Sequence, residues 1–83
     1  MIQVRYFASL REALGRSSES VDPPPSVTTV ASLRDHLAAR GEPWNALGTA
    51  RNLRAAVNQD MVGMEAPVAA GDEVAFFPPV TGG

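Results

Sequence analysis

The sequence predicts one small α+β domain in which a mixed sheet wraps over a single main helix. Apolar and polar residues alternate over 2–7 and 53–58, and residues 74–77 form an apolar run that favours a strand. A period of two is typical of strands with one packed face. Residues 30–37 instead carry apolar side chains at helical spacing. No internal repeat or domain boundary interrupts the chain, so we expect a single domain over residues 1–83.

The composition argues against several classes of function. The 83 residues include seven basic and nine acidic side chains, and this balance, a net charge of −2, does not suit a nucleic-acid groove or an anionic membrane partner. The chain has no cysteine and one histidine, His36, which leaves no set of metal ligands. We interpret His36 as a surface residue rather than a base or a ligand. No apolar stretch could span a bilayer and no signal peptide opens the chain, so we expect a cytoplasmic protein.

A first strand at 2–7 is followed by a short helix. Ser9 and Glu12 are spaced as a possible capping box, and Gly15 is expected to end the helix after one or two turns. The next stretch is rich in serine and proline, so at most residues 19–22 form a short edge strand.

Three consecutive prolines occupy positions 23–25. A proline run can be the ligand of an SH3-type groove, because it favours the polyproline conformation. We favour a simpler interpretation, in which the run is a stiff connector that delivers the chain to the main helix.

The main helix has recognisable ends. Thr29 is predicted to be its N-cap, and Gly41 is placed to be a left-handed C-cap. Residues 42–48 predict a further short helix with Pro43 in its first turn. We expect Trp44 to cap one edge of the core, since a lone tryptophan in a small domain is more often packed than used for binding.

The second half of the chain predicts three strands. Residues 53–58 are expected to form a central strand, and residues 58–60, Asn-Gln-Asp, a hairpin turn. A short return strand at 61–62 and an irregular connection over 63–70 then lead to the last strand at 74–77.

The last strand runs into residues 78–83, Pro-Pro-Val-Thr-Gly-Gly. Pro78 and Pro79 lack the amide hydrogen that a ladder needs and hold an extended conformation, so the chain should leave the sheet without curling back. Gly82 and Gly83 have no side chain, which lets the backbone enter a narrow channel of another protein. We therefore predict an extended C-terminal tail over 78–83 whose carboxylate is a chemical handle. The alternative is a chance pair of glycines at a frayed end.

These features resemble the small, sulfur-carrier subunits of molybdopterin synthase, the MoaD family, which are related to ubiquitin and to the thiamine-pathway sulfur carrier. The likeness spans nearly the whole chain and rests on residues 2–8 (IQVRYFA), 55–59 (AAVNQ) and 71–83 (GDEVAFFPPVTGG), of which the last block is specific. The resemblance implies a β-grasp, ubiquitin-like fold. In that fold the first and last strands lie side by side and parallel at the centre of the sheet.

The resemblance also implies a sulfur carrier with no active site of its own. An E1-like adenylating enzyme would use ATP to activate the Gly83 carboxylate, and a persulfide sulfur donor would then displace AMP to give a thiocarboxylate. In the large catalytic subunit of molybdopterin synthase, this sulfur would pass to cyclic pyranopterin monophosphate and build the molybdopterin dithiolene. The chain itself is expected to bind no cofactor. The family arrangement implied is a dimer of large subunits with one carrier at each end.

The site residues expected from this scheme lie at the end of the chain. Gly83 carries the sulfur and Gly82 keeps the tail slim. Phe76 or Phe77, whichever points away from the core, is a candidate anchor for the large subunit, the alternative being that both are buried on opposite sheet faces. The residues expected to guide the tail are Pro78, Pro79, Val80 and Thr81.

Three other functions stay open at this point. The chain could serve another sulfur pathway, such as thiamine synthesis or tRNA thiolation, although its Phe77-Pro78-Pro79 sequence favours the molybdopterin type. It could be a protein modifier joined through Gly83 to lysines of other proteins; the chain itself has no lysine, so it could not form chains of itself through side chains. It could also be an interaction module whose tail is inert.

Overall fold

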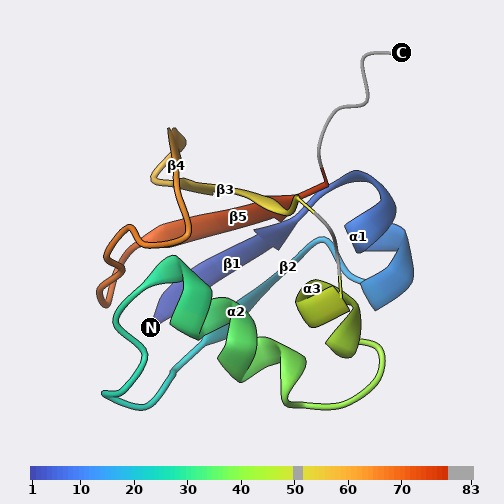
Figure 1. Ribbon diagram of the computed structural model, residues 1–83, viewed down its shortest axis with the longest axis horizontal. Helices are drawn as coiled ribbons and strands as arrows, with labels where there is room; N and C mark the ends of the chain where they lie inside the picture. Colours follow the sequence, from blue (N-terminus) through green and yellow to red (C-terminus); the bar gives the residue numbers. More distant parts are fainter. Residues whose placement is uncertain (50–51, 79–83) are drawn as a thin grey trace.

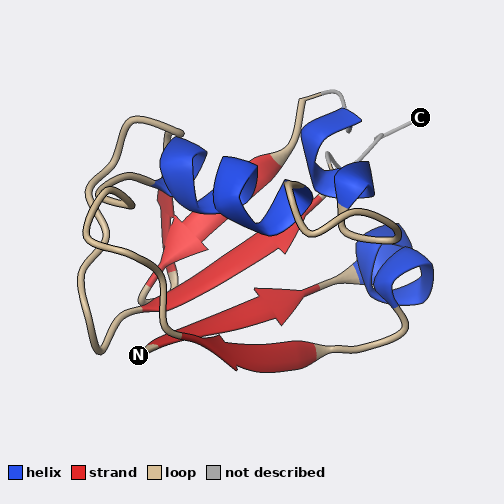
Figure 2. Cartoon of the chain, turned by 90° about the horizontal axis from the view of Figure 1, so that it is seen from below, coloured by secondary structure: helices blue, strands red, loops and turns tan. Residues whose placement is uncertain are grey.

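The computed structural model describes residues 1–49 and 52–78, and within this part of the chain a five-stranded mixed sheet carries the main helix across one face (Figures 1 and 2). The elements in chain order are β1 (Ile2–Tyr6), α1 (Ala8–Leu14), β2 (Ser18–Val21), α2 (Val30–Ala38), α3 (Asn45–Thr49), β3 (Arg54–Val57), β4 (Asp60–Val62) and β5 (Glu73–Phe77).

The strand order is β2-β1-β5-β3-β4, which places the last strand at the centre of the sheet. β1 and β5 run parallel, while the β1–β2, β3–β5 and β3–β4 pairs are antiparallel. A parallel pair needs a long crossover between its strands, and α2 lies within that crossover. The predicted mixed sheet with adjacent parallel first and last strands is therefore confirmed. β3 lies inside the sheet, next to the central strand, as its alternation indicated.

One face of the sheet, which we call the inner face, packs against α2. Tyr6 on β1 and Phe76 on β5 are almost completely inaccessible, at 1% and 0% exposure; they are neighbours in the parallel ladder and belong to the core between the sheet and the helices. The fully buried aliphatic residues around them are Val4, Val30, Leu33, Leu37, Leu47 and Val74.

The start of α2 is capped as predicted. The Thr29 hydroxyl accepts a hydrogen bond from the Ser32 amide at 3.1 Å, and the Thr29 amide donates to the Ser32 hydroxyl at 2.9 Å. This reciprocal pair satisfies two amides that the helix leaves free. The predicted end was too late: α2 ends at Ala38, and Gly41, with φ of +91°, takes the left-handed conformation in the turn that follows.

The predicted capping box of α1 is wrong. Phe7 is the N-cap and makes no side-chain cap hydrogen bond, so Ser9 already lies within the helix. The cause is the pairing of this segment with β5. The Phe7 amide still donates a hydrogen bond to the Phe76 carbonyl at 3.2 Å, while the Phe7 carbonyl already accepts one from the Leu10 amide at 3.1 Å. The chain therefore changes from strand to helix at one residue. Gly15 ends α1 in the left-handed conformation, as expected.

The remaining elements differ from the prediction only at their ends. β2 begins one residue earlier than the predicted edge strand, and α3 begins at Asn45, after Pro43 rather than around it. The β3–β4 hairpin turns through Asn58 and Gln59, whose φ values of 50° and 72° are those of a two-residue hairpin loop.

Candidate functional site

The root of the predicted tail is the end of β5, which pairs with a neighbouring strand on each side. Phe76 pairs with Tyr6 of β1, and Phe77 pairs with Arg54 of β3. Pro78 follows as a half-buried residue that can donate no ladder hydrogen bond. β5 is thus fixed to its last residue, and Figure 1 shows this end of the strand at the rim of the sheet beside α1.

The rest of the predicted tail lies outside the described residues. This applies to the sulfur-carrying position, Gly83, and to four of the five positions expected to guide or slim the tail: Pro79, Val80, Thr81 and Gly82. Their assigned roles stay predictions.

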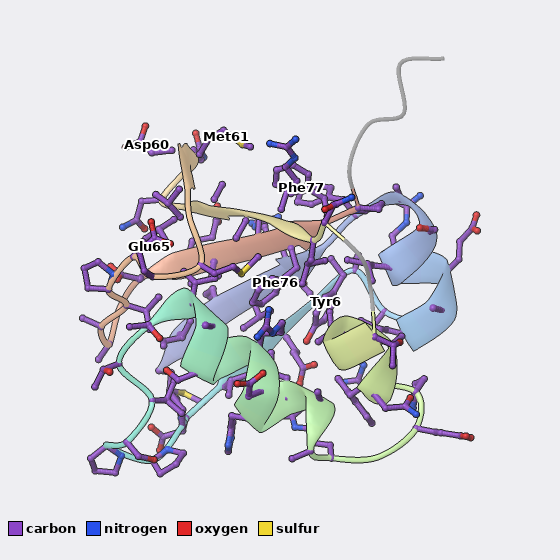
Figure 3. All side chains as sticks on the ribbon, viewed as in Figure 1. Tyr6, Asp60, Met61, Glu65, Phe76 and Phe77 are labelled. Carbon is purple, nitrogen blue, oxygen red and sulfur yellow. The ribbon has the colours of Figure 1, made fainter. Side chains whose placement is uncertain are left out.

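The two phenylalanines at the end of β5 have different environments. Phe76 is fully buried against the core, so its inclusion among the partner-binding residues is wrong: a strand alternates its side chains, and this position belongs to the inner face. Phe77 lies on the opposite, outer face and is half-buried. Figure 3 shows Phe76 and Tyr6 directed toward the helices, and Phe77 and Met61 on the other side of the sheet. Phe77 is the only one of the two that a partner could contact.

Two further large apolar side chains are exposed on the outer face: Phe7 beside Phe77, and Met61 two strands away on β4. The rings of Phe7 and Phe77 meet edge to face, with centroids 6.5 Å apart and an interplanar angle of 83°. Phe7 is 45% exposed and Met61, on β4, is 60% exposed. We call Phe7, Phe77 and Met61 the outer apolar strip. Large apolar side chains held in the open beside the root of a tail are typical of a protein-binding surface.

On the side of the inner face, a partly buried network joins elements that are far apart in the sequence. The Glu19 carboxylate, whose side chain is 10% exposed, accepts hydrogen bonds from the Tyr6 hydroxyl at 2.8 Å, the Arg40 guanidinium at 2.7 Å and the Trp44 indole at 3.1 Å. The guanidinium groups of Arg40 and Arg16 both lie over the Trp44 ring, 5.2 and 5.1 Å from its centroid. Trp44 packs against the core as predicted, but its polar role was missed.

This network sets the ionisation of its two titratable members. Burial of the Glu19 carboxylate disfavours its charge, but the hydrogen bonds from Arg40, Tyr6 and Trp44 outweigh burial and lower the pKa of Glu19 below its usual 4.5. Burial, together with the adjacent carboxylate, raises the pKa of Tyr6 well above its usual 10.0. Because the carboxylate already has three donors, it joins β1, β2 and the segment before α3 rather than acting as an acid or base.

The described residues hold neither a group of metal-binding side chains nor a membrane-spanning helix. Within residues 1–49 and 52–78, no group of three or more His, Cys, Asp or Glu side chains could hold a metal ion. His36 lies half-buried on α2. None of the helices in this part of the chain has the length and apolar character needed to cross a membrane.

The comparisons with known proteins agree with this geometry. The model of the ThiS family matches residues 4–83. The molybdopterin synthase sulfur carrier subunits of Escherichia coli and Haemophilus influenzae are 46% and 39% identical to this chain, and each alignment covers 100% of both proteins.

Solved structures share the fold. The small archaeal modifier protein 1 of Haloferax volcanii superposes with a TM-score of 0.76 at 26% identity, covering 95% of this chain and 97% of that one. Subunit 1 of the Helicobacter pylori molybdopterin-converting factor, solved in complex with subunit 2, superposes with a TM-score of 0.64 at 20% identity, covering 99% and 97% of the two chains.

Proposed function

Because this chain belongs to the ThiS family, we propose that it is the sulfur carrier subunit of a molybdopterin synthase and that its Gly83 carboxylate carries the sulfur. The observation that carries the proposal is the position of the end of β5. Pairing with β1 and β3 holds β5 as far as Phe77, and residues 78–83 follow directly. Strand hydrogen bonds on both sides resist fraying, so a partner can bind the end of the chain against a rigid base.

The chemistry needs help from other proteins, since a carboxylate is a poor electrophile. An E1-like enzyme would transfer AMP from ATP to the Gly83 carboxylate and release pyrophosphate. The terminal sulfur of a persulfide would then attack the activated carbonyl and expel AMP, giving an acyl disulfide. A thiol would reduce this disulfide and free the thiocarboxylate, which donates its sulfur to cyclic pyranopterin monophosphate in the large subunit.

The outer apolar strip is the proposed contact surface for these partners. The activating enzyme and the large subunit must both bind the same tail, and the strip lies next to its root. Phe77 directly precedes Pro78, the first residue of the tail, so a protein that encloses the tail will also reach Phe77. Aromatic side chains supply much of the binding energy of protein interfaces.

The test is the intact mass of the purified protein after incubation with an E1-like activating enzyme, ATP and a persulfide donor. A species heavier by the difference between one sulfur and one oxygen is expected, and the matched control lacking Gly83 should not form it. Adding the large subunit and cyclic pyranopterin monophosphate should then return the original mass as molybdopterin appears. A mass that never changes under conditions that charge the Escherichia coli carrier would overturn the proposal.

Conjugation to proteins is a second candidate function, because one structural neighbour is named a modifier protein. It would join the Gly83 carboxylate to lysines of other proteins. Adducts of higher mass in cells, lost on deletion of Gly83, would support this function. Molybdopterin formation without such adducts would leave sulfur transfer alone.

A further inference from the structure

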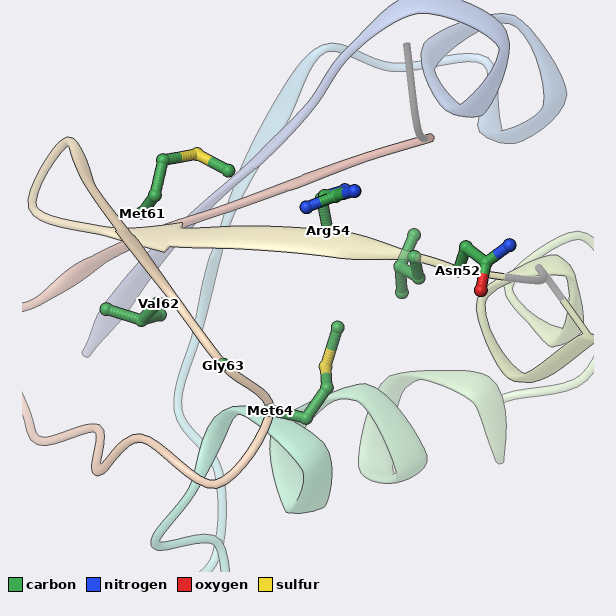
Figure 4. Close-up of a pocket in the computed structure, with 7 residues that line it drawn as sticks. Asn52, Arg54, Met61, Val62, Gly63 and Met64 are labelled. Carbon is green, nitrogen blue, oxygen red and sulfur yellow. The ribbon is translucent and has the colours of Figure 1, made fainter. Parts of the chain in front are cut away.

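A hollow lies at the open end of the β3–β4 hairpin, where the two chain segments diverge. It measures about 540 Å³ and is lined by residues 52–54 and 61–64 (Figure 4). The last ladder pair of the hairpin joins Ala55 and Val62. Beyond it, the chain turns away from β3 toward α2, where the Met64 carbonyl accepts a hydrogen bond from the Ala31 amide at 2.8 Å. We call this opening the hairpin notch.

The notch has an apolar floor and a cationic lip. Leu53, Val62 and Met64 are half-buried and pack against the core, so they line the floor. Arg54 is exposed on the outer face and projects on the same side of the hairpin as Met61 (Figure 4). Among the residues that the structure describes, no carboxylate lies within 4.0 Å of the guanidinium of Arg54 or of Arg11, whereas the other described arginines, Arg5, Arg16, Arg34 and Arg40, each have an acidic partner.

The notch falls within the reach of any protein that binds the tail. β3 separates it from β5, and neighbouring strands are about 4.8 Å apart, so the notch begins roughly 10 Å from the end of β5. A stable partner covers about 800 Å² of surface, a patch roughly 30 Å across. A protein that holds the tail and the outer apolar strip will therefore also cover Arg54, and a guanidinium covered without a counter-charge costs binding free energy.

We propose that the hairpin notch receives an extended, apolar segment of the partner protein that holds the tail, and that an acidic side chain of this segment pairs with Arg54. The inference rests on the proposed function, since it places the site within the interface with the large synthase subunit. It fits the chemistry of both parts of the notch: the floor takes aliphatic side chains, and the lip takes a carboxylate. Arg54 is thus a specificity-determining residue of the interface.

The test measures the Kd and the association rate between the carrier and the large synthase subunit of the same organism. Arg54→Gln should weaken binding about tenfold. Arg54→Glu should weaken it more strongly, since the new carboxylate would repel the acidic side chain of the partner. Both should slow association and reduce its dependence on salt. Arg34→Gln is the matched control, because it removes the same charge from α2, on the other side of the sheet; its Kd should change less than about twofold.

The outcomes separate the two proposals. If Arg54→Glu binds the large subunit as tightly as the wild-type protein does, the proposed pairing is overturned and the proposed function still stands. A wild-type protein that fails to bind the large subunit would overturn both. Urea unfolding of each variant shows whether it is folded, and Arg54→Lys, which keeps the charge, should restore most of the binding.

Discussion

Phe76 and Phe77 are neighbours of identical chemistry at the end of one strand, yet the structure places them in different environments. Phe76 faces the core and is completely buried, whereas Phe77 faces outward, meets Phe7 edge to face and stays partly exposed. The comparison extends to the whole sheet. The inner face holds the fold together, while the outer face leaves aromatic and thioether side chains open beside the root of the tail.

This division would let so small a protein bind the partners proposed for it. A domain of 83 residues buries a limited share of its surface and has modest stability, so each core aromatic matters. By placing core and contact residues on opposite faces of the same strand, the fold lets the contact surface vary with little effect on stability. The predictions below test this separation, in order of decreasing effect.

Phe76→Ala should be the most damaging change to the fold. Removing a fully buried phenylalanine leaves a cavity in the core beneath β5, and such substitutions cost about 3–5 kcal/mol of unfolding free energy. Urea denaturation measures the loss. A loss below about 1 kcal/mol would contradict the assignment of Phe76 to the core.

Phe77→Ala should act mainly on binding. Because Phe77 is partly exposed in the free protein, the variant should lose about 1 kcal/mol of stability, which includes its contact with Phe7. Affinity for the large synthase subunit should fall by at least about thirtyfold, as is usual for a central aromatic contact. Titration calorimetry measures the affinity. Equal effects of the two phenylalanine substitutions on stability and on binding would remove the distinction between the faces.

Glu19→Gln tests the contribution of the hydrogen-bond network around the Glu19 carboxylate to stability. The substitution removes charge-assisted hydrogen bonds and should cost about 1–3 kcal/mol at pH 7. The pKa of Glu19 is lower in the folded state than its usual 4.5, so below that pH the unfolded chain binds more protons. The stabilisation is therefore present above pH 4.5 and is lost as pH falls through the folded pKa.

Thermal unfolding of both proteins across pH 3–7 checks the Glu19 prediction. The two stability curves should converge at acid pH, since protonated Glu19 and glutamine are then both neutral. Parallel curves over the whole range would show that the carboxylate charge does not contribute.

Arg5→Gln should have the smallest effect on stability. Arg5 pairs with Glu73 at 2.8 Å on the outer face, but the arginine side chain is 53% exposed, and ion pairs of this kind contribute about 0–1 kcal/mol. Urea denaturation at low and high salt measures it. A loss above about 2 kcal/mol would show that the outer face also supports the fold.

Much of the architecture could be predicted because its signals are local. Alternation gave the strands at 2–7 and 53–58, Thr29 gave the start of the main helix, and the Asn58-Gln59-Asp60 turn gave the hairpin. The capping-box prediction failed because a distant contact intervened. Ser9 does not cap α1, because pairing of Phe7 with β5 fixes where the strand ends. The order of the strands came from the resemblance and not from periodicity.

The sequence by itself determined the strand and helix periods, the N-cap at Thr29 and the diproline and glycines that follow β5, because each depends on residues next to one another. Only the tertiary structure decided which phenylalanine is buried, how Glu19 joins Tyr6 to Arg40 and Trp44, and where the hairpin opens beside Arg54. Burial depends on what covers a side chain, and here the covering residues come from elements distant in the chain.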